Sequence, residues 1–257
     1  MSHLLELRNR LMRGGGAVLV LFIMAAPFAN TLYEYLAQPL MASLPAGNSM
    51  ISTEPHGPFF VPFKFAFAFA TAVAMPYLLY QLWAFVAPGL YEHEKKLTVP
   101  LLVSSSLLFY LGILFAYFIV FPLIFAFFTS TAPDGVLVMT DISAYLSFVL
   151  KLFFAFGLAF EVPVATVLMV RMGMATPESL ATKRPYIIVG AFVVGMVLTP
   201  PDIFSQTMLA IPVWLLFEAG LYFSRSIKPR SRDDEMESDE GMAEFEELGS
   251  DEDPPRN

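Results

Sequence analysis

The sequence predicts an all-α integral membrane protein with six transmembrane helices. Of its 257 residues, 56% are hydrophobic and only 15% are charged, and the mean hydropathy is +0.63. A typical soluble domain has about 25% charged residues, so this much apolar side chain cannot be buried inside one water-exposed globule. In addition, six apolar stretches reach or approach the length of about 20 residues that a helix needs to cross the hydrocarbon core.

The six stretches follow a short amphipathic segment. Residues 2–13 are expected to form a helix with Leu4, Leu7 and Leu11 on one side. Phenylalanines alternate between positions 63 and 69, as in a β-strand, but the apolar run continues for more than an ordinary strand length and so predicts a helix. The predicted spans cover residues 14–36, 63–86, 97–121, 145–170, 186–199 and 203–223.

The fifth and sixth predicted spans are short. Segment 186–199 lies between Pro185 and Pro200, and a helix of about 14 residues rises only ~21 Å against a hydrocarbon core of ~30 Å. A span of this length requires local thinning of the bilayer or burial among neighbouring helices.

The basic residues predict the orientation. Twelve Lys and Arg residues lie before the first span, between spans two and three, between spans four and five, and after span six. The intervening loops, about 37–62, 122–144 and 200–202, contain none. By the positive-inside rule both termini are expected to be cytoplasmic. Residues 1–224 would form the membrane domain, and residues 225–257 an acidic, disordered cytoplasmic tail.

Several classes of function are excluded by the composition. The chain has no cysteine, which excludes disulfides, thiol nucleophiles and Cys-ligated metal sites, and its three histidines leave little for a His-built metal centre. No G-x-S-x-G, H-E-x-x-H or Walker A motif occurs. We therefore expect no enzymatic activity, no cofactor, no bound metal and no nucleic-acid partner.

An ionisable residue within an apolar span is costly and is a candidate for function. Glu161 in the fourth span is the clearest. Pro163 cannot donate a hydrogen bond to the carbonyl of Ala159, so a polar notch is expected beside this carboxyl. The alternative is a hydrogen-bonded Glu161 that only fixes helix packing.

The remaining polar residues have simpler interpretations. Glu218 and Lys151 are expected to extend towards the nearest interface. Asp202 is expected to cap the sixth span and, with Gln206, to hydrogen-bond the proline-rich turn before it.

Four separated motifs stand out: HLLELRNR at 3–10, WAFVAPGLYEHE at 83–94, FGLAFEVP at 156–163, and the stretch 183–218, which begins with KRP, contains LTPPD and ends with FE. They occur in the order that the predicted topology requires. Together they resemble TatC, the polytopic core of the twin-arginine protein translocase, and the resemblance covers about residues 1–224. The main departure within the spans is Lys151.

The resemblance implies a concave bundle in the cytoplasmic (inner) membrane, with the function of a receptor. It would bind twin-arginine signal peptides of folded proteins and export them with TatA- and TatB-type single-span subunits and other copies of itself, driven by the proton-motive force. The carboxylates of Glu6 and Glu94 would bind the two arginines, because a guanidinium pairs bidentately with a carboxylate and lysine cannot. From the residues alone, Glu6 is an i,i+4 partner of Arg10 and Glu94 a solvated loop charge.

Two sets of site residues follow. The predicted signal-peptide site comprises Glu6, Arg8, Phe85 and Glu94, and the predicted partner or transport residues are Glu161, Pro39, Asp202 and Gln206.

Two other classes of function are open on the residues alone. A proton- or ion-coupled secondary transporter would use Glu161 and Glu218, although no internal repeat is present. A scaffold that gathers single-span proteins would be consistent with the short spans.

Overall fold

The computed structural model describes residues 2–43, 51–86, 95–131, 141–198 and 203–226, and every regular element in these ranges is a helix, as predicted. Five apolar helical stretches are long enough to cross a membrane, and Arg184–Val197 is a shorter apolar helix. The elements are α1 (Ser2–Ala25), η1 (Ala26–Phe28), α2 (Ala29–Ser43), α3 (Gly57–Val86), α5 (Lys95–Phe115), η2 (Ala116–Val120), α6 (Phe121–Ser130), α7 (Ile142–Ala159), α8 (Val162–Arg171), α9 (Pro177–Thr182), α10 (Arg184–Leu198) and α11 (Ile203–Arg225).

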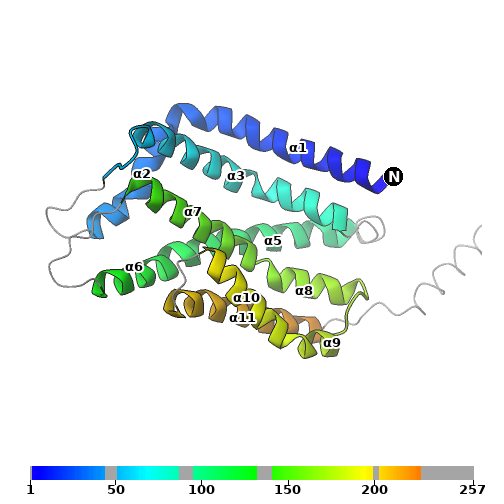
Figure 1. Ribbon diagram of the computed structural model, residues 1–257. Helices are drawn as coiled ribbons and strands as arrows, with labels where there is room; N and C mark the ends of the chain where they lie inside the picture. Colours follow the sequence, from blue (N-terminus) through cyan, green and yellow to red (C-terminus); the bar gives the residue numbers. More distant parts are fainter. Residues whose placement is uncertain (1, 44–50, 87–94, 132–140, 199–202, 227–257) are drawn as a thin grey trace, which may run out of the picture.

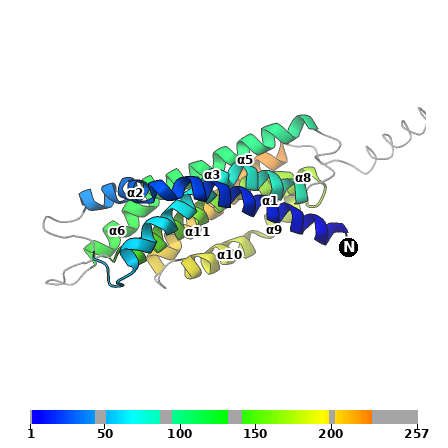
Figure 2. The same cartoon turned by 90° about the horizontal axis from the view of Figure 1, so that it is seen from above.

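The long helices lie side by side and reverse direction from one to the next (Figure 1). The N-terminus and the end of α11 lie at the same end of the bundle, which we call the N-terminal end. Seen from above, α10 lies at the outer edge of the array, beside α11 (Figure 2). Side chains from α3, η2, α6 and α7 form the largest buried cluster, which includes Val61, Val120, Ile124, Leu146, Val149, Leu152 and Phe156.

The amphipathic segment and the first predicted span form one continuous helix instead of two elements. α1 starts at Ser2, and the first interruption is the single 3-10 turn at Ala26–Phe28, within predicted span 14–36. Pro27 causes this turn because it has no N–H to donate to the preceding helix. The chain then continues into α2, so the proline bends the span without ending it.

The phenylalanine-rich segment is helical, which confirms that prediction. α3 covers it from Gly57 to Val86 in spite of two internal prolines. Between the phenylalanines, Ala66 and Ala70 are buried, whereas Phe67 and Phe69 are exposed. These alanines therefore face the neighbouring helices, and the rings of Phe67 and Phe69 lie on the exposed side of α3.

Two glycines allow α5 and α7 to cross in close contact. A Cβ atom on Gly112 of α5 would lie 2.8 Å from the carbonyl carbon of Phe156 and 3.0 Å from the Cα of Gly157. On α7, a Cβ on Gly157 would collide with the ring of Phe109. Small residues at helix contacts let backbones approach in this way within membranes.

The last three predicted spans differ in detail from expectation. The fourth is interrupted between Ala159 and Val162, next to Pro163. Helix α9, with a Thr176–Ser179 capping box, was not predicted. The fifth span is short, with 15 residues, but α11 has 23 residues and is long enough to cross the hydrocarbon core. The sixth span was expected to be short, and α11 is two residues longer than the predicted segment because the helix continues past residue 223 to Arg225.

At the opposite end of the bundle, Asp141 joins the start of α7 to the segment before α3. Its Oδ1 accepts hydrogen bonds from the N–H groups of Ser143 and Ala144, both at 2.9 Å, and caps α7. Its Oδ2 accepts from the N–H and the hydroxyl of Thr53, both at 2.8 Å. These bonds, the one from the Thr53 backbone first among them, lower the pKa of the Asp141 carboxyl from 3.8 to about 2.

A depressed pKa makes this link sensitive to acid. Because the folded-state pKa lies below the unfolded one, the carboxylate stabilises the fold above about pH 4, and this contribution is lost as the pH falls towards about 2. Asp141→Asn keeps a capping oxygen but has no charge to lose. We expect this variant to melt at a lower temperature than wild type at pH 7. Its melting temperature should also fall less than that of wild type between pH 4 and pH 2, as measured by thermal unfolding in detergent. Glu34→Gln, which removes an exposed carboxyl of α2, is the control, and identical acid profiles for wild type and Asp141→Asn would contradict the prediction.

Candidate functional site

The N-terminal end of the bundle holds a carboxylate–guanidinium pair that faces α3. Nε and Nη2 of Arg10 donate hydrogen bonds to Oε1 of Glu6 at 2.9 and 2.6 Å. Nη1 of Arg10 donates to Oε1 of Gln81 on α3 at 3.2 Å. The predicted i,i+4 pair is therefore present and also joins α1 to α3. Both bonds to Glu6 end on the same oxygen, and the Glu6 side chain is 42% exposed, so this carboxylate is accessible to a further donor.

Of the other three predicted members of this site, the structure describes Arg8 and Phe85 but not Glu94. Phe85 lies one turn beyond Gln81 on α3 and is half-buried, so it is at the same end as Glu6. Arg8 is exposed on α1. Glu94 lies outside the described residues. The structure thus brings Glu6 and Phe85 to neighbouring helices, with Gln81 as a contact that the sequence did not reveal.

Glu161 is buried and accepts a hydrogen bond from a neighbouring helix. The hydroxyl of Ser105 on α5 donates to Oε2 of Glu161, and Nε1 of Trp83 on α3 donates to the Ser105 oxygen at 2.9 Å. Glu161 is 7% exposed and Ser105 is fully buried. This relay joins three segments of the chain and is directed towards the carboxyl.

One oxygen of this carboxyl has no protein partner. Oε1 of Glu161 is buried without a hydrogen bond among the described residues. A buried unpaired acceptor is costly, so its retention at this place is a feature to be explained. The helix is interrupted between α7 and α8 where the notch was expected: the Glu161 N–H donates to the Leu158 carbonyl, and Pro163 lies in the first turn of α8.

The remaining partner or transport residues do not join Glu161 in a described cluster. Gln206 is half-buried on α11 and packs opposite Gly195 of α10. Pro39 lies within α2, near its end. Asp202, expected to cap the sixth span, lies outside the described residues.

An ion pair that the sequence did not predict joins α10 to α11. Nε and Nη2 of Arg184 donate to the two carboxylate oxygens of Glu218 at 2.6 and 2.8 Å. The bidentate geometry replaces the expected extension of Glu218 into the interface. Since Arg184 begins the short α10, the pair fixes that helix against α11.

Comparison with known proteins places this geometry in context. The family of Sec-independent protein translocase proteins (TatC) matches the chain over residues 2–212. Proteins named Sec-independent protein translocase protein TatC from Escherichia coli (strain K12) and Haemophilus influenzae are 56% and 55% identical over 234 residues, 91% of this chain and of each relative. The one from Aquifex aeolicus is 42% identical over 226 residues, 87% of this chain and 93% of its own.

The fold is similar to a solved structure as well. A crystal structure of the twin arginine translocase receptor TatC superimposes with a TM-score of 0.78 and 42% sequence identity, and covers 87% of this chain and 98% of its own. A second crystal structure of that receptor gives a TM-score of 0.79 at the same identity.

Proposed function

The chain belongs to the TatC family of Sec-independent protein translocase proteins, and on that premise we propose that its N-terminal end receives the signal peptide. It is a transport protein, the core subunit of the twin-arginine translocase. Glu6, Glu94, Arg8 and Phe85 form the proposed site for the twin arginines of folded precursors. The alternative, a solute transporter that uses Glu161, has no support in these relatives.

The observation that carries this proposal is the Glu6–Arg10 pair. A guanidinium already lies against the Glu6 carboxylate at hydrogen-bonding distance, on an accessible helix surface at the bundle end. The signal-peptide arginine would make the same kind of bond to Oε2 of Glu6, which accepts no hydrogen bond from the residues that the structure describes. Arginine offers a planar fork of donors, whereas lysine presents a single ammonium group, so the site would discriminate between them.

We further propose an orientation and partners. The described bases of α1, α9–α10 and the end of α11 gather at the N-terminal end, which the positive-inside rule assigns to the cytoplasm of the inner membrane. Residues 1–224 would form the membrane domain, and residues 225–257 a cytoplasmic tail, of which 227–257 lie outside the described residues. TatA- and TatB-type subunits and further copies of the chain would complete the complex, with Glu161, Pro39, Asp202 and Gln206 serving partner contact or transport.

A peptide-capture experiment tests the receptor function. The detergent-solubilised protein is crosslinked to a peptide with an Arg-Arg pair and to its Lys-Lys twin, with all other positions identical. We expect the Lys-Lys peptide to be captured at least about tenfold more weakly, because the bidentate charge-assisted bonds are lost. Equal capture of the two peptides would refute the receptor proposal.

The buried carboxyl gives a separate prediction. Glu161→Gln keeps an acceptor for the Ser105 hydroxyl, whereas Glu161→Ala leaves this buried donor unpaired, at a cost of about 1–3 kcal/mol. We expect Gln to retain assembly and export of a folded reporter, and Ala to weaken crosslinking to a single-span partner and to reduce export several-fold.

Two serines provide a matched control for Glu161. Ser105→Ala removes the donor to Glu161 and should reduce partner crosslinking and export, as Glu161→Ala does. Ser104→Ala removes only a bond within α5 and should behave as wild type. Equal export by the Ala and Gln variants of Glu161 would show that the buried carboxyl has no role in transport.

A further inference from the structure

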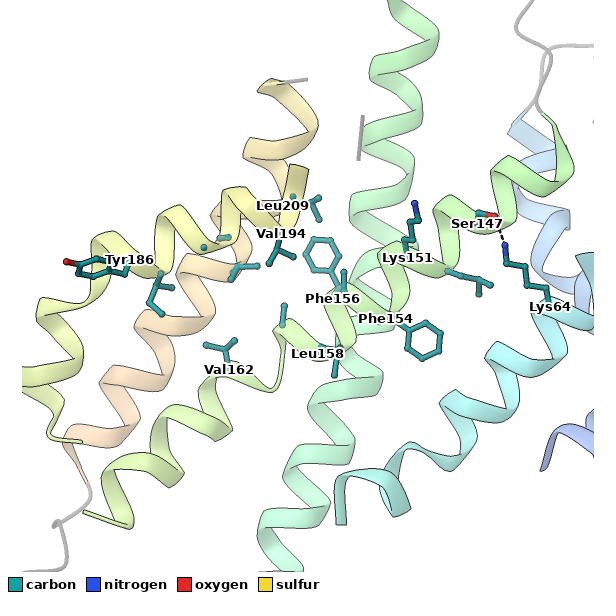
Figure 3. Close-up of a pocket in the computed structure, with 18 residues that line it drawn as sticks. Lys64, Ser147, Lys151, Phe154, Phe156, Leu158, Val162, Tyr186, Val194 and Leu209 are labelled. Atoms are coloured by element: carbon teal, nitrogen blue, oxygen red, sulfur yellow. Dashed lines mark hydrogen bonds between the residues drawn. The ribbon is translucent and has the colours of Figure 1, made fainter. Parts of the chain in front are cut away.

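An apolar pocket lies between α7 and α10 (Figure 3). Its volume is about 850 Å³, and most of its 18 lining residues are apolar. Among them, Lys64, Ser147 and Lys151 lie together at one side, whereas Tyr186 lies at the far side. The proposed signal-peptide site uses none of these residues.

The two lysines form a pair of positive charges, and no carboxylate of the described residues forms an ion pair with either of them. Nζ of Lys64 on α3 donates a hydrogen bond to Oγ of Ser147 on α7 at 2.8 Å. Lys151 lies one helical turn after Ser147 on the same helix. Both lysine side chains are exposed, and neither forms an ion pair within the part of the chain that the structure describes.

Both lysines lie at a similar depth in the bundle. Helices α3 and α7 start at the same end, where Thr53 is bonded to Asp141. From these starts Lys64 and Lys151 are about 10 and 13 Å along the helix axes. Helix α3 and the combined stretch α7–α8 each have 30 residues, which corresponds to a length of ~45 Å, against a hydrocarbon core of ~30 Å. If the core is centred on these stretches, the lysine backbones lie a few Å inside its boundary. Long basic side chains extend from such positions back to the headgroup layer.

We propose that this pocket binds an anionic phospholipid. Its phosphate would lie between the ammonium groups of Lys64 and Lys151, and an acyl chain would lie along Phe154, Leu158 and Val162. Charge complementarity favours this occupant, because the clustered donors lie near headgroup level. The wall beyond them is apolar up to Tyr186, as an acyl chain requires and as a polar peptide does not.

Lipid retention tests this site in the full-length protein. Native mass spectrometry in detergent measures binding of phosphatidylglycerol and of phosphatidylcholine with identical acyl chains. The variants are Lys64→Gln, Lys151→Gln and the double substitution, and Lys183→Gln, an exposed lysine at the other end of the bundle, is the matched control. We expect the double variant to bind phosphatidylglycerol at least about tenfold more weakly, with phosphatidylcholine unaffected and Lys183→Gln as wild type.

The outcomes separate lipid from other occupants. Circular dichroism and the melting temperature establish that each variant is folded. Equal retention of the two lipids by the wild type, or an undiminished preference for phosphatidylglycerol in the folded double variant, would overturn the proposal. A single-span peptide with one glutamate is the third arm. If the two lipids bind alike and this peptide binds the wild type but not the double variant, the lysines serve a protein partner and the lipid assignment is wrong.

Discussion

Glu94→Ala is expected to abolish capture of a twin-arginine peptide, and Glu6→Ala to weaken it. Removing one charged hydrogen-bonding partner costs about 1.5–3 kcal/mol, which corresponds to a loss of about 10- to 150-fold in affinity. The Glu6 effect is expected at the lower end. Arg10 already occupies Oε1 of Glu6, so an incoming guanidinium must share or displace it. Photocrosslinking of a labelled Arg-Arg peptide across a concentration series measures both losses.

The control for these variants is a carboxylate without a proposed role. Glu178 is exposed in the first turn of α9, at the N-terminal end of the bundle, and Glu178→Ala should capture the peptide as wild type does. Melting temperatures of all variants should stay within a few degrees of wild type, since Glu6 is on an accessible surface. If assembly is lost together with peptide capture, the carboxylates have a folding role and the receptor assignment of these residues fails.

The helical class and the helix positions were predictable, because they depend on local properties of the chain. Long apolar runs in the sequence correspond to α3, α5–α6, α7–α8 and α11, and prolines mark where helices bend or break. Pro163 predicted the disturbance next to Glu161. The capping pattern Thr176-Pro177 with Ser179 was also present in the sequence and could have revealed α9.

The partners of the site residues were not predictable, because they depend on how helices cross. Arg10 and Gln81 are 71 residues apart in sequence, and Ser105 and Glu161 are 56 apart. A serine within an apolar run does not indicate which carboxyl it will contact. The same holds for Arg184 and Glu218. The first was expected as a cytoplasmic loop charge and the second as a side chain that extends to the nearest interface, whereas the structure pairs them.

The crossing that brings Ser105 to Glu161 depends on a glycine, and its substitution is expected to have the largest effect on stability. Gly112→Ala adds one carbon that would lie 2.8 Å from the Phe156 carbonyl carbon and 3.0 Å from the Gly157 Cα. Both are backbone atoms, so no side chain can rotate away and α5 must move from α7. Overpacking costs about 1–3 kcal/mol. Helix propensity favours alanine over glycine by about 1 kcal/mol.

Because the two effects oppose each other, a second glycine is needed to separate them. Gly190 on α10 is also within a helix, and a Cβ there would meet no atom within 4 Å apart from its chain neighbours and the nearby backbone of its own helix. Gly190→Ala therefore receives the propensity gain without the collision and should melt at or slightly above the wild-type temperature. We expect Gly112→Ala to melt several degrees below wild type in detergent, at about 2–4 °C per kcal/mol, and to weaken Glu161-dependent partner crosslinking because Ser105 moves with α5. If both alanine variants were equally stable, the α5–α7 contact would not limit the fold, and the relay from Trp83 to Glu161 would need another explanation for its geometry.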